Sequence, residues 1–293
     1  RFNDDDSPYM SRTATAGGSQ QIFTWAGWIK RGDITGSNMR IFGNRGNSDN
    51  TSYFYLNTTN QLQFYSSDSD NNGGYISVTT RALLRDSSAW YHVVFGVDIT
   101  DSGSEVYIWV NGVNMATDRS TGTSGGAFST SHVCRINDPG VSQWFGRQGT
   151  DSAGQSMDGY FAEVYFIDGA RWGGTVFGET NEDTNQWVSK SDTDVKAAVT
   201  FGENGYFFQF QDSSAFGDDL SGEGNDYATS GLAAVDQMLD SPTNNFCTLT
   251  GQLLISWGTR SYAEANLKFT SSSGDWNACG GSWSVNSGKW YWE

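Results

Sequence analysis

Along most of the chain, short hydrophobic runs are separated by short polar runs, and this pattern predicts β-strands. The runs are rich in Val, Ile and aromatic residues, and clusters of Gly, Asn, Asp and Ser separate them, as is typical of strands joined by turns. No segment keeps an apolar period of 3.6 residues, although 194–199 (DVKAAV) could form one short helical turn. The predicted strands are 22–30, 39–44, 52–57, 61–66, 74–80, 89–98, 105–112, 142–148 and 159–169. Many short strands at this spacing indicate an all-β sandwich or barrel.

The strand at 89–98 (AWYHVVFGVD) contains one of the two histidines of the chain. In a strand, Trp90, His92 and Val94 share one face, and the residues between them share the other. Both faces are largely apolar, which predicts an inner strand covered on both sides. No acid or nucleophile stands at a suitable spacing beside His92, so we interpret it as a structural residue. His132, in a Ser-rich loop, is equally isolated.

The composition supports a core built from aromatic side chains, and it excludes some classes of binding partner. Hydrophobic residues make up only 37% of the 293 residues, but 12 Trp, 13 Tyr and 18 Phe can fill a core. The net charge of −16 would cause repulsion from nucleic acid and from anionic membrane surfaces, so neither is an expected partner. No apolar run approaches the roughly 20 residues of a membrane span, and membrane insertion is not expected.

The three cysteines, Cys134, Cys247 and Cys279, are too few for a disulfide framework. Two arrangements fit the sequence equally well: one disulfide pair with one free thiol, or three free thiols. Proximity in sequence makes Cys247 and Cys279 the better candidates for a pair. None of the three stands in a C-x-x-C or Cys/His pattern with zinc spacing.

Five stretches, in order, resemble the concanavalin A-like jelly rolls of the laminin-G-like lectin/glucanase superfamily. They are FTWAGWIKRG (23–32), AWYHVVFGVD (89–98), EVYIWVNG (105–112), FGRQG (145–149) and MDGYFAEVYFIDG (157–169). Each is weak alone, but the ordered set spans about 150 residues. The resemblance implies a concanavalin A-like jelly-roll β-sandwich.

Three later stretches resemble β proteins encoded by bacteriophages, especially marine ones. They are VFGETNEDTNQWV (176–188), ENGYFFQFQDSSAFGDDLSGEGNDYAT (203–229) and DSPTNNF (240–246). In ordinary members of the superfamily the element similar to 203–229 precedes the first strand, whereas here it follows the last. It could complete the same sandwich in permuted order, since the ends of a domain often lie close together, or it could open a second module.

The last residues favour a second module, because SGKWYWE (287–293) resembles the beginning of a SPRY domain. We therefore expect a jelly-roll domain at 1–180, a Gly/Asp-rich connector at 181–245 that could complete the sandwich, and the start of a second β module at 246–293. A strand at 290–292 would be an unpaired edge, so we expect either that the chain is a fragment or that this edge pairs with a neighbouring subunit.

Catalysis is not expected. Glycoside hydrolases on this fold place two carboxylates on one strand face, as E-x-D-x-x-E or E-x-D-x-E, so that one attacks and the other protonates. The strand with spaced carboxylates here carries Glu163 and Asp168, which are five residues apart and so point to opposite faces. The motifs of serine hydrolases, zinc proteases and P-loop proteins are also missing from the sequence.

Acidic, glycine-rich loops are candidates for a structural calcium ion, because hard cations prefer carboxylate, amide and carbonyl oxygens. GDDLSGEGND (217–226) offers Asp218, Asp219, Asn225 and Asp226. Weaker candidates are Asp68, Asp70, Asn71 and Asn72, and Asp4, Asp5 and Asp6. The resemblance implies a calcium role for Asp219, Ser221, Gly222, Gly224 and Asn225, but the usual Asp of the "iDEV" motif is replaced by Ala162. The alternative is a tight turn held by hydrogen bonds from Asp side chains.

Carbohydrate binding would use aromatic rings that stack on sugar C–H faces beside Asn and Asp side chains that bind hydroxyls. The aromatics that we assign to loops are Tyr75, Trp144, Trp172 and Trp187. The alternative for each is packing against a neighbouring subunit. Most of the other aromatics lie inside predicted strands and are expected in the core.

Taken with the bacteriophage resemblance, these observations predict a non-catalytic virion surface protein: a fibre, an appendage or a capsid decoration. It would be extracellular, bind host surface glycans, contact other virion proteins and form a homo-oligomer. One alternative is a purely structural subunit of a capsid or an extracellular filament. The other is a polysaccharide-degrading tail enzyme.

Overall fold

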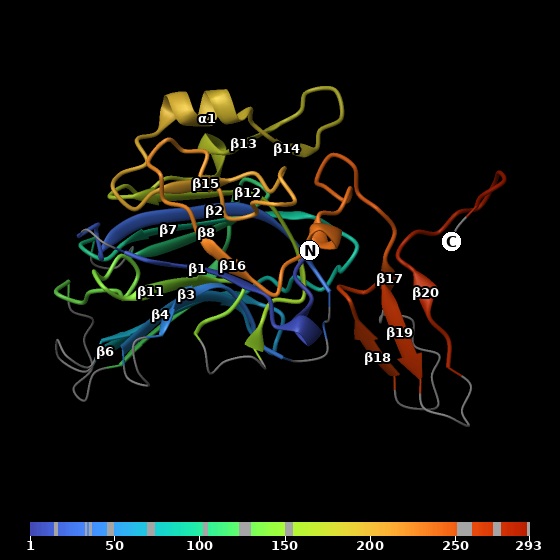
Figure 1. Cartoon of the computed structure of the whole chain (residues 1–293), viewed down its shortest axis with the longest axis horizontal. Coiled ribbons are helices and arrows are strands. Elements are labelled where there is room, and N and C mark those ends of the chain that lie inside the picture. Colours follow the sequence, from blue (N-terminus) through green and yellow to red (C-terminus); the bar gives the residue numbers. More distant parts are fainter. Residues whose placement is uncertain are drawn as a thin grey trace.

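Two antiparallel β-sheets packed face to face form the body of the protein in this computed structural model (Figure 1). The structure describes residues 1–14, 17–32, 34, 37–45, 50–68, 74–101, 105–122, 130–149, 155–250, 260–271 and 277–291. The all-β jelly-roll prediction is confirmed. The predicted helical turn is α1 (Asp192–Ala198). The residue before it, Ser191, caps the helix, because its side chain accepts a hydrogen bond from the N–H of Asp194.

Within the described residues, one sheet has eight strands and the other has six. The order in the eight-stranded sheet is β10 (Thr117–Gly122), β6 (Gly74–Thr80), β5 (Leu62–Asp68), β4 (Asn50–Leu56), β3 (Met39–Arg45), β11 (Ser142–Phe145), β1 (Tyr9–Thr13) and β16 (Ala228–Ser230). The order in the six-stranded sheet is β15 (Tyr206–Phe208), β12 (Gly159–Asp168), β2 (Ile22–Arg31), β7 (Tyr91–Asp98), β8 (Val106–Val110) and β9 (Val113–Asn114).

Aromatic rings fill the space between the two sheets, as the composition predicts. Phe54 of β4 lies near the centre, with its ring centroid 4.3 Å from that of Phe95 in β7 and 5.2 Å from that of Phe64 in β5. The Phe23 and Trp25 rings of β2 lie 6.3 and 6.4 Å away. Because these side chains come from both sheets, the rings interlock the two layers.

The segment 181–245 contributes strands to both layers of the sandwich. β15 pairs with β12 at the edge of the six-stranded sheet, and β16 pairs with β1 at the edge of the eight-stranded sheet. The chain after residue 180 therefore supplies an edge strand to each layer. The division into domains that the sequence indicates stays a prediction.

A covering layer hides the outer face of the six-stranded sheet (Figure 1). It consists of η3 (Gly174–Val176), the hairpin of β13 (Gly178–Thr180) and β14 (Trp187–Ser189), and α1. The buried residues between this layer and the sheet are Ala26, Val94, Tyr165, Ile167, Phe177, Val195, Val199, Phe201 and Phe207. β7 is consequently covered on both sides, as its sequence predicts.

His92 is a structural residue of this covered face. It lies between the rings of Trp28 and Trp187, at centroid distances of 5.1 and 6.0 Å, and is 2% exposed. Burial lowers the pKa of His92 to about 3, so the imidazole is neutral in the folded protein. His132 is also buried, and its Nε2 lies 2.8 Å from Ser66 Oγ.

The C-terminal part forms two small sheets beside the sandwich, β17 (Leu249–Thr250) with β20 (Gly280–Gly281) and β18 (Arg260–Ala263) with β19 (Lys268–Ser271) (Figure 1). Asn266 Nδ2 donates to the Gly32 carbonyl at 3.1 Å, and the Ala265 N–H donates to Asp158 at 2.8 Å, which attaches this part to the sandwich. The likeness to a SPRY domain stays a prediction.

All three cysteines are free thiols, which is one of the two arrangements that fit the sequence. In the ladder of β17 with β20, Leu249 lies opposite Gly281 and Thr250 lies opposite Gly280. Cys247 and Cys279 are therefore offset along the direction of this ladder.

Among the helices that the structure describes, none has the length and the apolar character that crossing a membrane requires.

Candidate functional site

A row of side chains crosses the outer face of the eight-stranded sheet, the face that points away from the core. Its members come from seven adjacent strands: Ser11, Trp144, Gly43, Tyr53, Tyr65, Ser77 and Ser120. Alternation along each strand explains the row, because Phe54 and Phe64 point inward while the tyrosines beside them point outward. We call the outward aromatic residues Tyr53, Tyr55, Tyr65, Tyr75 and Trp144 the tyrosine face.

The rings of the tyrosine face lie against one another across the strands. Tyr53 and Tyr65 are stacked with centroids 5.4 Å apart, and Tyr65 and Tyr75 are stacked at 5.9 Å. Tyr53, Tyr65, Tyr75 and Trp144 are half-buried, so part of each ring faces solvent. The sheet fixes the positions of these partly exposed rings, which together offer apolar surface and hydroxyl groups to a ligand.

Gly43 interrupts the row between Trp144 and Tyr53. A Cβ atom at this position would lie 2.6 Å from Tyr53 Cα, which is closer than packed side chains allow. The two rings are separated by two strand spacings, roughly 10 Å, and the residue between them has no side chain.

Arg40 lies at the edge of the tyrosine face and stiffens it. Its guanidinium carbon is 3.8 Å from the ring centroid of Tyr53 and 4.5 Å from that of Tyr55, and the residue is 6% exposed. Arg40 Nη2 donates to Gln155 Oε1 at 2.5 Å, while Nε and Nη1 are buried without a hydrogen-bond partner. Burial is the main cause that lowers the pKa of Arg40.

Polar groups flank the rings and provide hydrogen-bonding capacity. Gln63 lies opposite Tyr55 and donates to Ser77 Oγ at 2.6 Å, and it accepts from Asn57 Nδ2 at 3.2 Å. Tyr75 Oη lies 3.2 Å from Ser120 Oγ. The combination of aromatic rings with amides and hydroxyls matches the chemistry expected for carbohydrate recognition.

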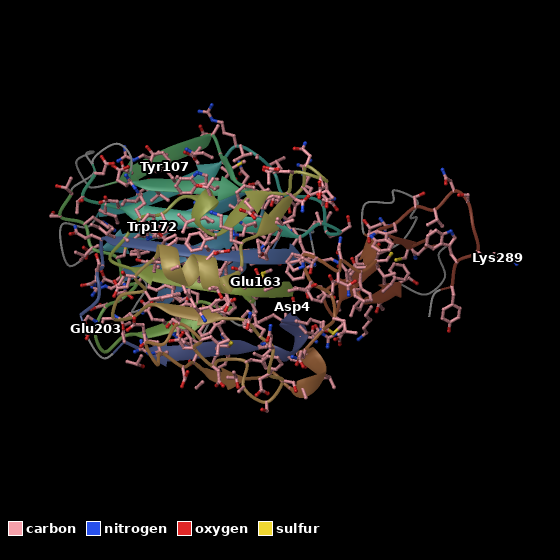
Figure 2. The ribbon with its side chains drawn as sticks, turned by 90° about the horizontal axis from the view of Figure 1, so that it is seen from above. Asp4, Tyr107, Glu163, Trp172, Glu203 and Lys289 are labelled. Atoms are coloured by element: carbon pink, nitrogen blue, oxygen red, sulfur yellow. The ribbon has the colours of Figure 1, made fainter. Side chains whose placement is uncertain are left out.

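The four aromatics predicted for sugar binding separate into two groups. Tyr75 lies in β6 and Trp144 in β11, so both belong to the tyrosine face and neither is in a loop. Trp187 begins β14 and Trp172 follows β12, and both are packed in the covering layer on the opposite sheet. Figure 2 looks onto this covered side, with α1 in the foreground and Trp172 labelled. The structure therefore places only the first two on one surface.

The sequence analysis missed Tyr53, Tyr55 and Tyr65, because it assigned most aromatics of the predicted strands to the core, and it did not consider Arg40. The signal was present in SYFYLN (52–57), where Tyr and the apolar residues Phe and Leu alternate. A tyrosine that alternates with core residues points out of the sheet, and its hydroxyl suits a surface position.

The acidic loop at 217–226 is held closed by its own hydrogen bonds. Asp219 Oδ1 accepts from the N–H groups of Phe207 and Ser221, and Oδ2 accepts from Ser221 Oγ and the Asn225 N–H, at 2.7–2.9 Å. These four donors use the carboxylate fully. Asp226 Oδ1 accepts from the Asp219 N–H at 2.8 Å, and Asp218 is exposed.

This arrangement does not fit a calcium site. A cation would have to displace the four donors to Asp219, and the described residues include no group of three or more His, Cys, Asp or Glu that could hold a metal ion. Asn225, which is 3% exposed, uses Nδ2 to donate to the carbonyls of Glu203 and Gly205. The loop has the geometry of the hydrogen-bonded turn, which was the alternative interpretation.

The other two acidic stretches differ from each other. Asp68 is buried at the end of β5 and accepts from the Val133 N–H at 3.3 Å, whereas Asp70, Asn71 and Asn72 lie outside the described residues. Asp4, Asp5 and Asp6 form the exposed helical turn η1 (Asp4–Asp6), capped by Asn3. Calcium binding at either stretch stays a prediction.

Glu163 and Asp168 point to opposite sides of the six-stranded sheet. Glu163 has a left-handed backbone, with φ 48°, at a bulge in β12, and its side chain lies toward Ser189 of the covering layer. Asp168 accepts from the Ser19 N–H at 2.8 Å and from Asn137 Nδ2 at 3.0 Å. Burial raises the pKa of both carboxyls. They do not form a pair across a shared cleft.

The comparison with protein families gives one match. A family model described as the concanavalin A-like lectin/glucanases superfamily matches residues 4–176, which is more than half of the chain. The comparison with curated proteins returns no match.

Similar solved structures include a heptameric SAP-like pentraxin from Limulus polyphemus, at 16% identity and a TM-score of 0.38, covering 56% of this chain and 71% of that one. Domains LG4-5 of the mouse laminin α1 chain match at 12% identity and 0.40, covering 65% and 43%. Tailspike protein 2 of an Escherichia coli O157:H7 bacteriophage matches at 16% and 0.35, covering 55% of this chain and only 21% of that one. At these identities the similarity concerns the fold alone.

Proposed function

Because the chain belongs to the concanavalin A-like lectin/glucanases superfamily, we propose that it is a lectin-like protein that binds carbohydrate on its tyrosine face without catalysis. The observation that carries this proposal is the set of stacked, half-buried rings on the outer face of the eight-stranded sheet. A sugar can stack on aromatic side chains only when these are held in fixed positions, and the strands of this sheet hold them so. The carboxylates Glu163 and Asp168, which point apart, support a binding role over hydrolysis.

We further propose that the protein is exposed on a virion as a fibre, an appendage or a capsid decoration, where its ligand is a host surface glycan. This part rests on the stretches 176–188, 203–229 and 240–246, which resemble bacteriophage proteins. An extracellular location, contacts with other virion proteins and assembly into a homo-oligomer belong to the same proposal. The net charge of −16 favours neutral glycans over acidic ones.

Binding of the purified protein to a glycan array, followed by calorimetric titration of the best ligand, tests the carbohydrate proposal. Tyr65→Ala removes the central ring and should weaken binding roughly tenfold, the effect of losing an aromatic contact worth about 1.5 kcal/mol. Tyr107→Ala is the matched control, because Tyr107 is a half-buried tyrosine of the other sheet, 5.6 Å from Trp109. Equal losses in both variants would contradict a site on the tyrosine face.

A second candidate function is a structural assembly subunit without sugar affinity. It is favoured by exposed apolar side chains in the C-terminal part: Trp283 is 53% exposed, Trp290 59% and Tyr291 82%. Large exposed rings are typical of surfaces that another protein covers. Absence of binding to every glycan, together with a concentration-dependent increase in mass, would favour this function. Shortening of a host polysaccharide on incubation would instead favour the tail enzyme.

A further inference from the structure

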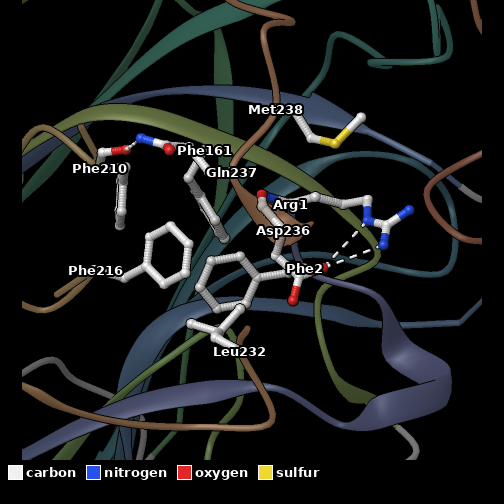
Figure 3. Close-up of a pocket in the computed structure, with 9 residues that line it drawn as sticks. All are labelled: Arg1, Phe2, Phe161, Phe210, Phe216, Leu232, Asp236, Gln237 and Met238. Carbon is white, nitrogen blue, oxygen red and sulfur yellow. Dashed lines mark hydrogen bonds and ion pairs between the residues drawn. The ribbon is translucent and has the colours of Figure 1, made fainter. Parts of the chain in front are cut away.

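Two hollows adjoin at Phe210, just after β15, in the part of the chain that follows the family match. The inner one is a cavity of about 40 Å³, lined by the apolar side chains of Phe2, Phe161, Phe210, Phe216, Leu232 and Met238 and by Arg1, Asp236 and Gln237 (Figure 3). This volume suits water and is too small for an organic ligand. The outer one has a volume of about 470 Å³, which lies within the range of small-ligand sites.

The wall between the two hollows is fixed by an unusual backbone at Phe210. Its φ of 59° lies in the left-handed region, which is rare for a bulky residue and costs energy. The ring points into the inner cavity (Figure 3), 6.0 Å from Phe208 and 6.1 Å from Phe145. Gln237 Nε2 donates to the carbonyls of Phe210 and Gln211, which holds this turn. The outer groove is therefore preformed.

The groove combines amides, a hydroxyl, carboxylates and apolar surface. Its lining residues are Gln209, Phe210, Gln211, Asp212, Ser213, Ala215, Asp218, Leu220 and Gln237. The groove lining contains no Lys or Arg, and the chain carries a net charge of −16, so an anionic ligand would be repelled. Amide side chains both donate and accept hydrogen bonds, as sugar hydroxyls require. Leu220, 43% exposed, offers an apolar contact for C–H groups.

We propose that this groove is a second binding site, for an uncharged, hydroxyl-rich ligand such as a neutral saccharide unit. Gln209 and Gln211 supply amides that both donate and accept hydrogen bonds, and Gln237 Oε1 and Asp218 accept from hydroxyls. Asp218 is thereby assigned to the groove and not to the closed loop of Asp219. The site is formed by residues 209–220 and Gln237, outside the segment 4–176 that matches the family, and it does not depend on the tyrosine face.

Nuclear magnetic resonance of the whole chain tests this, because the glutamine side-chain amides report directly on the groove. The probes are glucose, galactose, mannose and N-acetylglucosamine, with glucuronate and spermidine as charged comparisons. At least one neutral sugar should shift the side-chain amide signals of Gln209 and Gln211 in a saturable way. No saturable shift with any neutral sugar, or shifts with spermidine or glucuronate alone, would overturn the proposal.

Two variants locate the effect. Ala215→Trp fills the groove and should abolish the Gln209 shifts, and Gln211→Ala should weaken them. Ala197→Trp adds the same ring at an exposed position of α1 and should leave them unchanged. Shifts that persist at Gln209 in a folded Ala215→Trp protein would overturn the groove as the site. Signals of Tyr53 and Tyr65 in the same spectra report on the tyrosine face separately, so failure of one site is distinguishable from failure of the other.

Discussion

The Lys30 ammonium donates a hydrogen bond to Asp240 Oδ2 at 2.7 Å, and both side chains are almost completely buried. Asn245 Oδ1 and the Phe246 carbonyl accept the other two hydrogen bonds of Lys30, at 2.7 and 2.8 Å. Asp240 also accepts from Trp90 Nε1 at 2.8 Å. The stretch DSPTNNF (240–246), noted for its resemblance to bacteriophage proteins, thus satisfies the buried lysine of β2 and fixes the C-terminal segment against the sandwich.

Asp240→Ala should destabilise the fold by about 3–5 kcal/mol, because it leaves the Lys30 charge buried beside only neutral acceptors. Chemical denaturation followed by tryptophan fluorescence measures this change. Asp118→Ala is the matched control: Asp118 pairs with Arg81, but both side chains are more than 60% exposed, so its loss should cost less than about 1 kcal/mol. Similar losses in the two variants would show that the buried pair does not hold the segment.

The alternation of apolar and polar residues and the aromatic content were enough to predict the two layers of the sandwich, but not the edge strands of its sheets. The strand predicted at 74–80 is the one observed, and 22–30 differs from β2 by one residue, because both contain strong β-formers between turn residues. β16 was missed because Ala228–Ser230 is short, exposed and polar, so it carries no apolar signal. Its place depends on pairing with β1, which is far away in sequence.

The candidate site was predictable only in part, for a related reason. Tyr75 and Trp144 were identified as sugar-binding candidates, but their neighbour Tyr65 was assigned to the core. Which face of a strand is buried depends on the layer that covers it, and one sequence alone does not specify that layer. Trp172 and Trp187 illustrate the converse, since they belong to the covering layer itself and are half-buried by packing beside the six-stranded sheet.

His92 makes the stability of the fold depend on pH. Its pKa is about 3 when folded and roughly 6.5 when the chain is unfolded. The unfolded state therefore binds a proton that the folded state rejects. The stabilisation is complete above about pH 6.5 and is lost as pH falls toward 3, by on the order of 5 kcal/mol in total. Urea unfolding at several pH values measures this loss.

His92→Phe keeps a ring between Trp28 and Trp187 but cannot titrate. Carboxylates contribute to acid unfolding in both proteins, so the informative quantity is the difference between them. The free energy of unfolding of His92→Phe should rise relative to that of the wild type as the pH falls below about 6.5. Parallel pH profiles for the two proteins would contradict a neutral, buried His92.

Gly43→Ala should disturb the tyrosine face from within its own sheet. The new Cβ would lie 2.6 Å from Tyr53 Cα, so β3 and β4 must separate, at a cost of about 1–3 kcal/mol. Displacement of Tyr53 should also weaken glycan binding. Gly17→Ala is the control, because nothing lies within 4 Å of a Cβ at that position. Unfolding and binding measured on both variants check this prediction, which fails if Gly43→Ala behaves as Gly17→Ala does.

Asp219 should stabilise the loop at 217–226 without a cation. Because four donors already occupy its carboxylate, a calcium chelator should leave the Tm of the protein unchanged. Asp219→Ala should lower the free energy of unfolding by about 2–4 kcal/mol, because it leaves the N–H groups of Phe207 and Asn225 without an acceptor. Asp212→Ala is the control: it removes the acceptor of a Ser214 turn at the surface, where water can replace it, so its effect on the free energy of unfolding should be much smaller. A Tm that rises with added calcium in the wild type, but not in Asp219→Ala, would mean that the loop opens to bind the ion.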